Sequence, residues 1–132
     1  LMASCRVKPV LNQLELHPGY MQHSAVEYWK KHGVLLQAWS PLGRRALMEE
    51  PLMISLSAKY GLSVPQLCLR YLVQSGIAPV VKSSSEERML QNMDIYDFNI
   101  SEEDMWMISC MPQTAWSGEH PDFAIPTVKS QK

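Results

Sequence analysis

The stretch VVKSSSEERMLQN, residues 80–92, places a lysine, three serines and an arginine between an apolar run and a helical pattern. Unpaired N–H groups and the positive end of the helix dipole attract anions to a helix N-terminus, and Lys82 and Arg88 would add donors that phosphates accept. The stretch therefore indicates a phosphate site. The alternative is that Ser84 caps the helix while both cations are solvated surface charges. Because the sequence has no GxGxxG or Walker motif, spacing alone does not indicate a nucleotide.

Three short apolar runs are predicted to be strands, and each is followed by helical periodicity. Repeats of strand and helix in units of roughly 30 to 40 residues indicate parallel βα architecture, either an open doubly wound sheet or part of a barrel. The predicted strands cover residues 9–16, 34–40 and 77–81, and the predicted helices cover or begin at 23–33, 51–60, 63, 84 and 101.

Serines mark where several of these helices should begin. Ser63 with Gln66, and Ser84 with Glu87, have the spacing of a capping box, in which side chain and backbone satisfy each other across the first turn. Ser101 is expected to begin the last helix. The sequence after Pro112 has no period.

Ligands in both parallel architectures lie at the carboxyl ends of the strands. That edge selects Gln13 and Glu15, then Trp39 and Ser40, and then residues 82–84. Gln13 and Glu15 could instead face solvent, although the apolar strand makes this the less favoured interpretation. Trp39 could instead be an ordinary packing residue in the interior of a barrel.

Length and composition limit the partners. The 132 residues, 46% of them hydrophobic, suit one globular domain, and a net charge of -1 argues against partners chosen by bulk charge, such as nucleic acid or a membrane surface. No run approaches roughly 18 apolar residues, the length of a spanning helix. Three cysteines without pairing or metal-ligand spacing fit a reducing compartment, so we expect a cytoplasmic protein.

The motifs NQLELHP, QAWSPLG and VVKSSSEERMLQN, in this order and at these separations, resemble the last three strands of an aldo/keto reductase. The tail SGEHPDF is similar to the carboxyl end of bacterial members, including the diketogulonate reductase type. The resemblance covers residues 8–123. It implies an α/β fold, the carboxyl-terminal part of a (β/α)8 TIM barrel with about three of its eight strands. Residues 1–132 would then form one partial barrel domain, with an irregular tail at 112–132.

The resemblance also implies that NADPH binds in an extended pose and passes a hydride to an aldehyde or ketone. By position, Gln13 would bond the nicotinamide carboxamide and Trp39 would stack on the nicotinamide ring. Ser40 and Leu42 would line the path of the pyrophosphate. An indole offers a flat face at low entropic cost, which suits this role for Trp39.

The third motif would hold the adenosine end of the cofactor. Lys82, Ser83 and Arg88 would bind the 2′-phosphate, and Asn92 the adenine amino group. Gln91 stands where an acidic residue is common in the family. The full predicted cofactor-binding set is Gln13, Trp39, Ser40, Leu42, Lys82, Ser83, Ser84, Arg88, Gln91 and Asn92.

No segment resembles the motifs that carry the family's catalytic tetrad of aspartate, tyrosine, lysine and histidine. We therefore expect no catalytic residue and no metal ligand here, and an inactive chain when it stands alone. One rival interpretation is a non-catalytic NADP-binding or regulatory barrel relative, and another is a structural half-barrel without a ligand. The full-length protein is expected to be a monomer or weak dimer that acts on a small-molecule carbonyl substrate.

Three aromatic residues outside these roles are also expected to matter. His17 precedes Pro18 and is expected to shape a turn, not to catalyse. Trp116 and Phe123 are expected either to border the substrate pocket or to plug the edge of the barrel.

Overall fold

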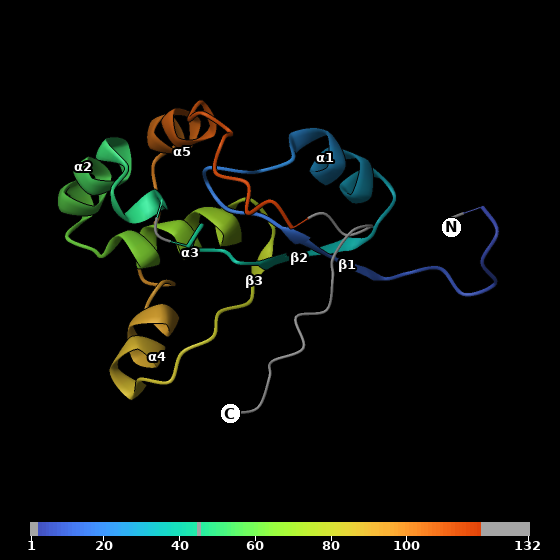
Figure 1. The fold of residues 1–132 in the computed structure, drawn as a ribbon, viewed down its shortest axis with the longest axis horizontal. Coiled ribbons are helices and arrows are strands. Elements are labelled where there is room, and N and C mark those ends of the chain that lie inside the picture. Colours follow the sequence, from blue (N-terminus) through green and yellow to red (C-terminus); the bar gives the residue numbers. More distant parts are fainter. Residues whose placement is uncertain (1–2, 45, 120–132) are drawn as a thin grey trace.

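The computed structural model describes residues 3–44 and 46–119, which form a three-stranded parallel sheet and its helices (Figure 1). The strands lie in the order β1-β2-β3, so the predicted parallel βα architecture is confirmed. The elements are β1 (Leu11–Glu15), α1 (His23–Lys31), β2 (Leu35–Trp39), the 3₁₀ helix η1 (Ala46–Met48), α2 (Pro51–Tyr60), α3 (Val64–Gln74), β3 (Ala78–Pro79), α4 (Glu86–Met93) and α5 (Glu102–Ser109).

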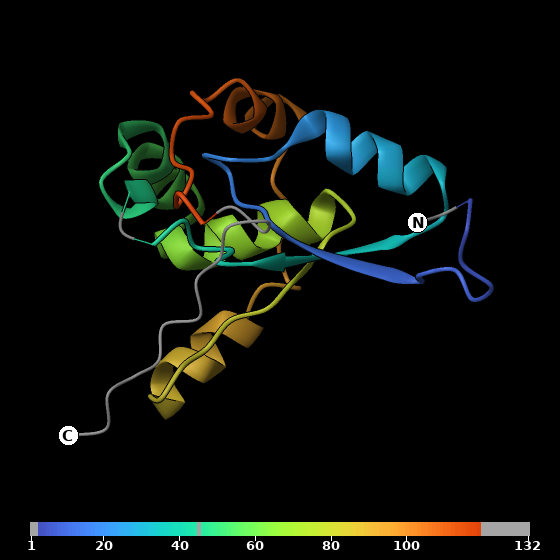
Figure 2. The same ribbon diagram turned by 45° about the vertical axis from the view of Figure 1, so that its right-hand side comes forward.

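The two faces of the sheet differ in their burial. Helices α1 and α5 lie together on one side of the sheet (Figure 2), and α4 lies past β3, where it contacts α3. Leu36 and Ala38 on β2 are buried in a core that includes Leu67 and Leu72 of α3. Because side chains alternate along a strand, Leu35 points to the other face, where it is 69% exposed. The described chain therefore covers one face of the sheet with helices and leaves apolar side chains on the other.

Helix starts follow the predicted caps, with one correction. The capping box of α3 is present, since Ser63 Oγ accepts from Gln66 N and Gln66 Oε1 accepts from Ser63 N at 3.1 Å. The cap of α4 is Ser85, which accepts from Arg88 N at 3.5 Å, so the prediction that Ser84 caps this helix was wrong. The Ser83 hydroxyl accepts a hydrogen bond from Ser85 N at 3.2 Å and closes a turn before the helix. The helix therefore begins one residue later than predicted.

The third strand is shorter than predicted. Residues 77–81 were expected to be extended, but only Ala78–Pro79 pairs as β3. The backbone N–H of Ile77 closes the end of α3 by donating to Leu72 O. Val80 N donates to Ala38 O at 2.9 Å, and β2 ends one residue later, at Trp39. Strand β3 stops because its partner turns away.

Helix α5 is fixed to α2 by a buried carboxylate. Asp104 is fully buried and accepts from Lys59 Nζ at 2.7 and 3.0 Å, and also from the Tyr60 hydroxyl. The hydrogen bonds from Lys59 and Tyr60 hold the pKa of Asp104 below its usual range. None of the helices within the described ranges is long and apolar enough to cross a membrane.

Candidate functional site

Strands β1 and β2 bring the first two predicted site residues to one face of the sheet. Gln13 pairs in register with Gln37, and Glu15 pairs with Trp39. Residues two apart in a strand share a face, so all four side chains lie opposite the buried Ala38 and away from the helix-covered core. Gln13 Nε2 donates to Gln37 Oε1 at 2.6 Å. Gln13 and the half-buried Trp39 therefore lie on the face where a barrel interior would be.

The loop after β2 forms a tight turn next to this edge. Ser40 adopts a left-handed conformation with φ of 53°, and its carbonyl accepts from Gly43 N at 2.9 Å. Gly43 has φ of 57°, and an added Cβ would lie 2.8 Å from a Leu47 methyl group, so the turn requires glycine here. The residues of this loop line a cleft together with Val80, Val81 and Lys82, which follow β3.

Two adjoining clefts lie between this loop, the end of β3 and helix α4. The first holds about 320 Å³, and its described lining includes two cations and no acidic residue. The second holds about 480 Å³ and shares two lining residues with the first. The first cleft is lined by Ser40, Pro41, Leu42, Arg44, Val80, Val81 and Lys82, and the second by Val81, Lys82, Ser83, Met89, Asn92 and Met93.

The clefts gather half of the predicted cofactor-binding set. Ser40 and Leu42 of the loop after β2 line the first cleft, and Ser83 and Asn92 line the second. Lys82 lines both, so it lies where the two clefts adjoin. The remaining members do not line them: Gln13, Trp39, Ser84, Arg88 and Gln91.

These remaining residues of the third motif lie on the surface. Ser84, Arg88 and Gln91 are exposed. Arg88 lies in the first turn of α4, where the helix begins with unpaired N–H groups. Lys82 precedes this helix start by four residues, and the first turn also carries Glu86 and Glu87, so the phosphate site stays a prediction.

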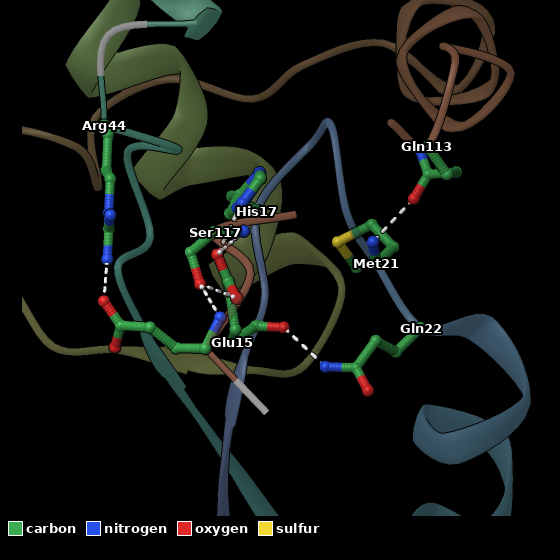
Figure 3. Close-up of polar contacts among 8 residues, drawn as sticks. Glu15, His17, Met21, Gln22, Arg44, Gln113 and Ser117 are labelled. Atoms are coloured by element: carbon green, nitrogen blue, oxygen red, sulfur yellow. Dashed lines mark hydrogen bonds and ion pairs between the residues drawn. The ribbon is translucent and has the colours of Figure 1, made fainter. Parts of the chain in front are cut away.

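Glu15 has a partner that the sequence did not reveal. Its carboxylate is 4% exposed and accepts two hydrogen bonds from Ser117, from the backbone N–H at 3.1 Å and from the hydroxyl at 2.7 Å (Figure 3). The two residues are 102 positions apart, and the only signal for this contact was the strand-end rule that selected Glu15. The segment 113–119, which follows α5, therefore returns to the carboxyl end of β1.

Further contacts hold this returning segment in place. Gln113 accepts from Met21 N at 2.6 Å and donates to Pro18 O at 2.9 Å (Figure 3). Arg44 forms an ion pair with Glu119. Trp116 stacks on Tyr20 with ring centroids 6.4 Å apart. Phe123, the other aromatic residue predicted to border the pocket, lies outside the described residues, as does the part of the predicted tail after residue 119.

His17 is enclosed beneath this segment. It is fully buried, and its backbone and that of Tyr20 exchange two hydrogen bonds, so it shapes the expected turn. Neither ring nitrogen makes a hydrogen bond within the described part of the chain, although Nε2 lies 3.5 Å from Glu15 Oε1. Burial lowers the pKa of His17, which outweighs the opposing influence of Glu15. The imidazole is therefore a neutral part of the core and is closed to substrate.

The described residues contain no group of three or more His, Cys, Asp or Glu side chains that could hold a metal ion. The polar groups that line the two clefts are instead an amide, hydroxyls and cations. Such groups bind and orient an anionic or amide-bearing ligand.

Parallel strands with interleaved helices and polar groups at their carboxyl ends define the chain as part of a (β/α)8 barrel. The model of the aldo/keto reductase family matches residues 2–110. The chain belongs to the aldo/keto reductase family.

Curated relatives and solved structures agree with this assignment. Glyoxal reductase of Bacillus subtilis is 36% identical over 122 residues, which is 92% of this chain and 44% of the relative. A structure of a Gox0644 mutant in complex with NADPH superposes with a TM-score of 0.88 at 29% identity and covers 94% of this chain and 46% of that one. An aldo/keto reductase of Brucella melitensis has a TM-score of 0.77 at 37% identity, over 82% and 41% of the two chains. This chain spans less than half the length of each.

Proposed function

We propose that this chain is the cofactor-binding part of an NADPH-dependent aldo/keto reductase that reduces aldehydes or ketones to alcohols. The observation that carries the proposal is the pair of adjoining clefts that share Val81 and Lys82, the first lined also by Ser40 and Leu42 and the second by Ser83 and Asn92. Structures of two similar proteins, the Gox0644 mutant and an aldo-keto reductase of Bombyx mori, hold NADPH and NADP respectively. Residues 1–132 would belong to one barrel domain.

The nicotinamide end would lie on the open face of β1 and β2. Gln13, already held by Gln37, offers an amide that can bond the nicotinamide carboxamide. Trp39 is half-buried beside it and offers an indole face for the planar ring. Ser40 and Leu42 would line the path of the pyrophosphate toward Lys82.

The adenosine end would lie at the start of α4. Lys82 and Ser83 line the second cleft, and Arg88 projects from the first turn of the helix. A guanidinium beside an ammonium at a helix start favours a dianionic 2′-phosphate over a hydroxyl. Asn92 would bond the adenine amino group. Ser84 and Gln91 complete the proposed set at this end.

When bound, NADPH supplies the hydride that reduces the carbonyl carbon. The residues of this chain bind the cofactor at both ends and orient its nicotinamide ring toward the barrel interior. Reduction also requires a proton donor, typically a phenol made acidic by a neighbouring lysine. None of the residues assigned here has that role.

The cellular setting is part of the same proposal. Cys5, Cys68 and Cys110 are free thiols, which suits a reducing compartment such as the cytoplasm. We expect the full-length protein to be a monomer or weak dimer acting on a small carbonyl compound.

Cofactor preference tests the proposal directly. Arg88→Gln in the full-length protein should weaken NADPH binding by about tenfold to a hundredfold, because charge-assisted hydrogen bonds are lost, and should leave NADH almost unchanged. Both titrations can be followed by cofactor fluorescence, with Glu87→Gln as a surface control on the same helix turn. The difference in NADPH affinity between the wild-type protein and Arg88→Gln should become smaller as the salt concentration rises.

The titrations, together with an assay of aldehyde reduction by the full-length protein, separate the alternatives. A regulatory relative would keep the preference for NADPH without turnover. A purely structural half-barrel would show no preference between the two cofactors. An equal loss for NADPH and NADH on Arg88→Gln would refute the assignment of the 2′-phosphate to this helix start.

A further inference from the structure

Arg44 is a cation of the first cleft to which neither the motifs nor the family resemblance gave a role. It follows the turn that Ser40 and Gly43 close after β2, and its side chain is 56% exposed. It lines the 320 Å³ cleft with Lys82, and the described lining of that cleft contains no acidic residue. Two cations facing one hollow repel each other unless an anion lies between or beside them.

The anion that pairs with Arg44 comes from a distant part of the sequence. Glu119 lies 75 positions further along and forms an ion pair with the Arg44 guanidinium (Figure 3). The Glu119 side chain is 57% exposed, and exposed ion pairs contribute little to stability because water and salt screen them. This carboxylate is therefore easily exchanged for a stronger anion.

The segment that carries Glu119 is attached elsewhere. Ser117, two residues earlier, donates twice to the buried Glu15, and the Ser117 hydroxyl also accepts from Glu119 N at 3.2 Å. The backbone position of Glu119 thus depends on Glu15 and does not require Arg44. Arg44 can leave its ion pair without releasing the segment from the sheet.

We propose that Arg44 is a further cofactor-binding residue, which binds the pyrophosphate of the dinucleotide, and that Glu119 holds its guanidinium until the phosphates replace the carboxylate. This inference rests on the proposed function, because it takes the first cleft as the pyrophosphate path. A guanidinium binds phosphate oxygens in a bidentate manner, and these bonds are stronger than a screened surface pair. Glu119 is thus a competitor of the cofactor for Arg44.

The proposal predicts opposite effects for the two partners of one ion pair. Arg44→Gln should weaken NADPH binding about tenfold, since it removes charge-assisted bonds. Glu119→Gln should strengthen NADPH binding by about two- to fivefold, because the free energy of an exposed ion pair with Arg44 no longer competes with the cofactor. If the ion pair only stabilised the fold, both variants would bind NADPH more weakly.

Smaller probes separate the two ends of the cofactor. In the full-length protein, Arg44→Gln should weaken the binding of ADP, which carries the paired phosphates, and should leave the affinity for adenosine 2′-monophosphate unchanged. Arg88→Gln should weaken the binding of adenosine 2′-monophosphate and leave the affinity for ADP unchanged. In the Arg44→Gln background, Glu119→Gln should have no further effect on NADPH. Binding can be measured by calorimetry, and thermal unfolding of each variant checks that the fold is retained.

Each outcome decides the matter. If the wild-type protein binds neither NADPH nor ADP, the proposed function and this inference both fail. If NADPH binds and Arg88→Gln weakens it while Arg44→Gln does not, only the role of Arg44 is refuted. A loss of NADPH affinity in Glu119→Gln would also overturn it. If Arg44→Gln is unstable, Arg44→Lys can replace it, because lysine keeps the charge but loses the bidentate geometry. We expect Arg44→Lys to lose part of the affinity for ADP. An unchanged affinity for ADP would contradict the proposal.

Discussion

Gln13 on β1 donates a hydrogen bond to Gln37 on β2, with 2.6 Å between Nε2 and Oε1. The two residues are register partners on the face of the sheet that the helices leave uncovered. A side-chain amide held by a second amide presents its remaining hydrogen-bonding groups in a fixed direction. Gln37, the first residue of the motif QAWSPLG, was given no role of its own by the sequence, and it orients a residue of the proposed nicotinamide site.

Substitution of Gln37 tests this orientation. We expect Gln37→Ala to weaken NADPH binding about two- to fivefold, since one ordered neutral hydrogen bond is worth roughly 1 kcal/mol. The change should have no effect in a Gln13→Ala background, and Asn12→Ala on the opposite face is the matched control. Fluorescence titration measures NADPH binding by the wild-type protein, the two single variants, the double variant and Asn12→Ala. Equal weakening by Gln37→Ala with and without Gln13 would show that Gln37 acts through the fold alone.

A second prediction concerns turnover. The polypeptide of residues 1–132 should reduce no aldehyde above background even with excess NADPH, because no segment resembles the motifs that supply the proton donor and its lysine. The loss of NADPH absorbance with a small aldehyde measures the rate. If a rate is observed and the Lys82→Ala variant lowers it, the expectation is contradicted. A rate that Lys82→Ala leaves unchanged comes from contaminating host enzymes.

The uncovered face of the sheet predicts self-association of the same polypeptide. Leu11 is 44% exposed and its register partner Leu35 is 69% exposed, and the outer sides of β1 and β3 are sheet edges among the described residues. Exposed apolar surface and open edges pair with other chains, so we expect concentration-dependent oligomers. Leu35→Lys should shift the distribution toward monomer in sedimentation experiments. A cooperative unfolding transition of a wild-type monomer at micromolar concentration would refute this prediction.

The buried His17 predicts a dependence of stability on pH. Its native pKa is lowered by burial, while the unfolded imidazole titrates near its ordinary value of about 6.5. Between these two values the unfolded state binds more protons, so the free energy of unfolding falls as the pH decreases below about 6.5. Glu15 opposes this effect by favouring the imidazolium, and its own carboxylate is held by Ser117.

Denaturant unfolding between neutral and mildly acidic pH measures this dependence. His17→Gln should lower the stability at neutral pH and flatten its decline on acidification. His23→Gln, at an exposed position on α1, should leave the decline unchanged. A decline that persists in His17→Gln would assign it to other groups.

The order of strands and helices was predictable because its signals are local. The helix 51–60 ends at Gly61, whose φ of 67° is a left-handed conformation that glycine adopts without strain, and Ser63 forms the predicted capping box. Such contacts span three or four residues and need no partner from elsewhere. The motif at residues 80–92 likewise marked the cleft before any fold was known.

Only the tertiary structure decided which distant residues share the edge of the sheet. Three consecutive serines could each cap α4, and the turn made by Ser83 selected Ser85. The contacts of Glu15 with Ser117, and of Arg44 with Glu119, join positions far apart in the sequence, and no periodicity encodes where a returning segment will lie. Leu35 and Leu36 are apolar neighbours on opposite faces of β2, so the pattern could not show that the described chain buries Leu36 and exposes Leu35. Local patterns determine elements, whereas the site depends on how those elements pack.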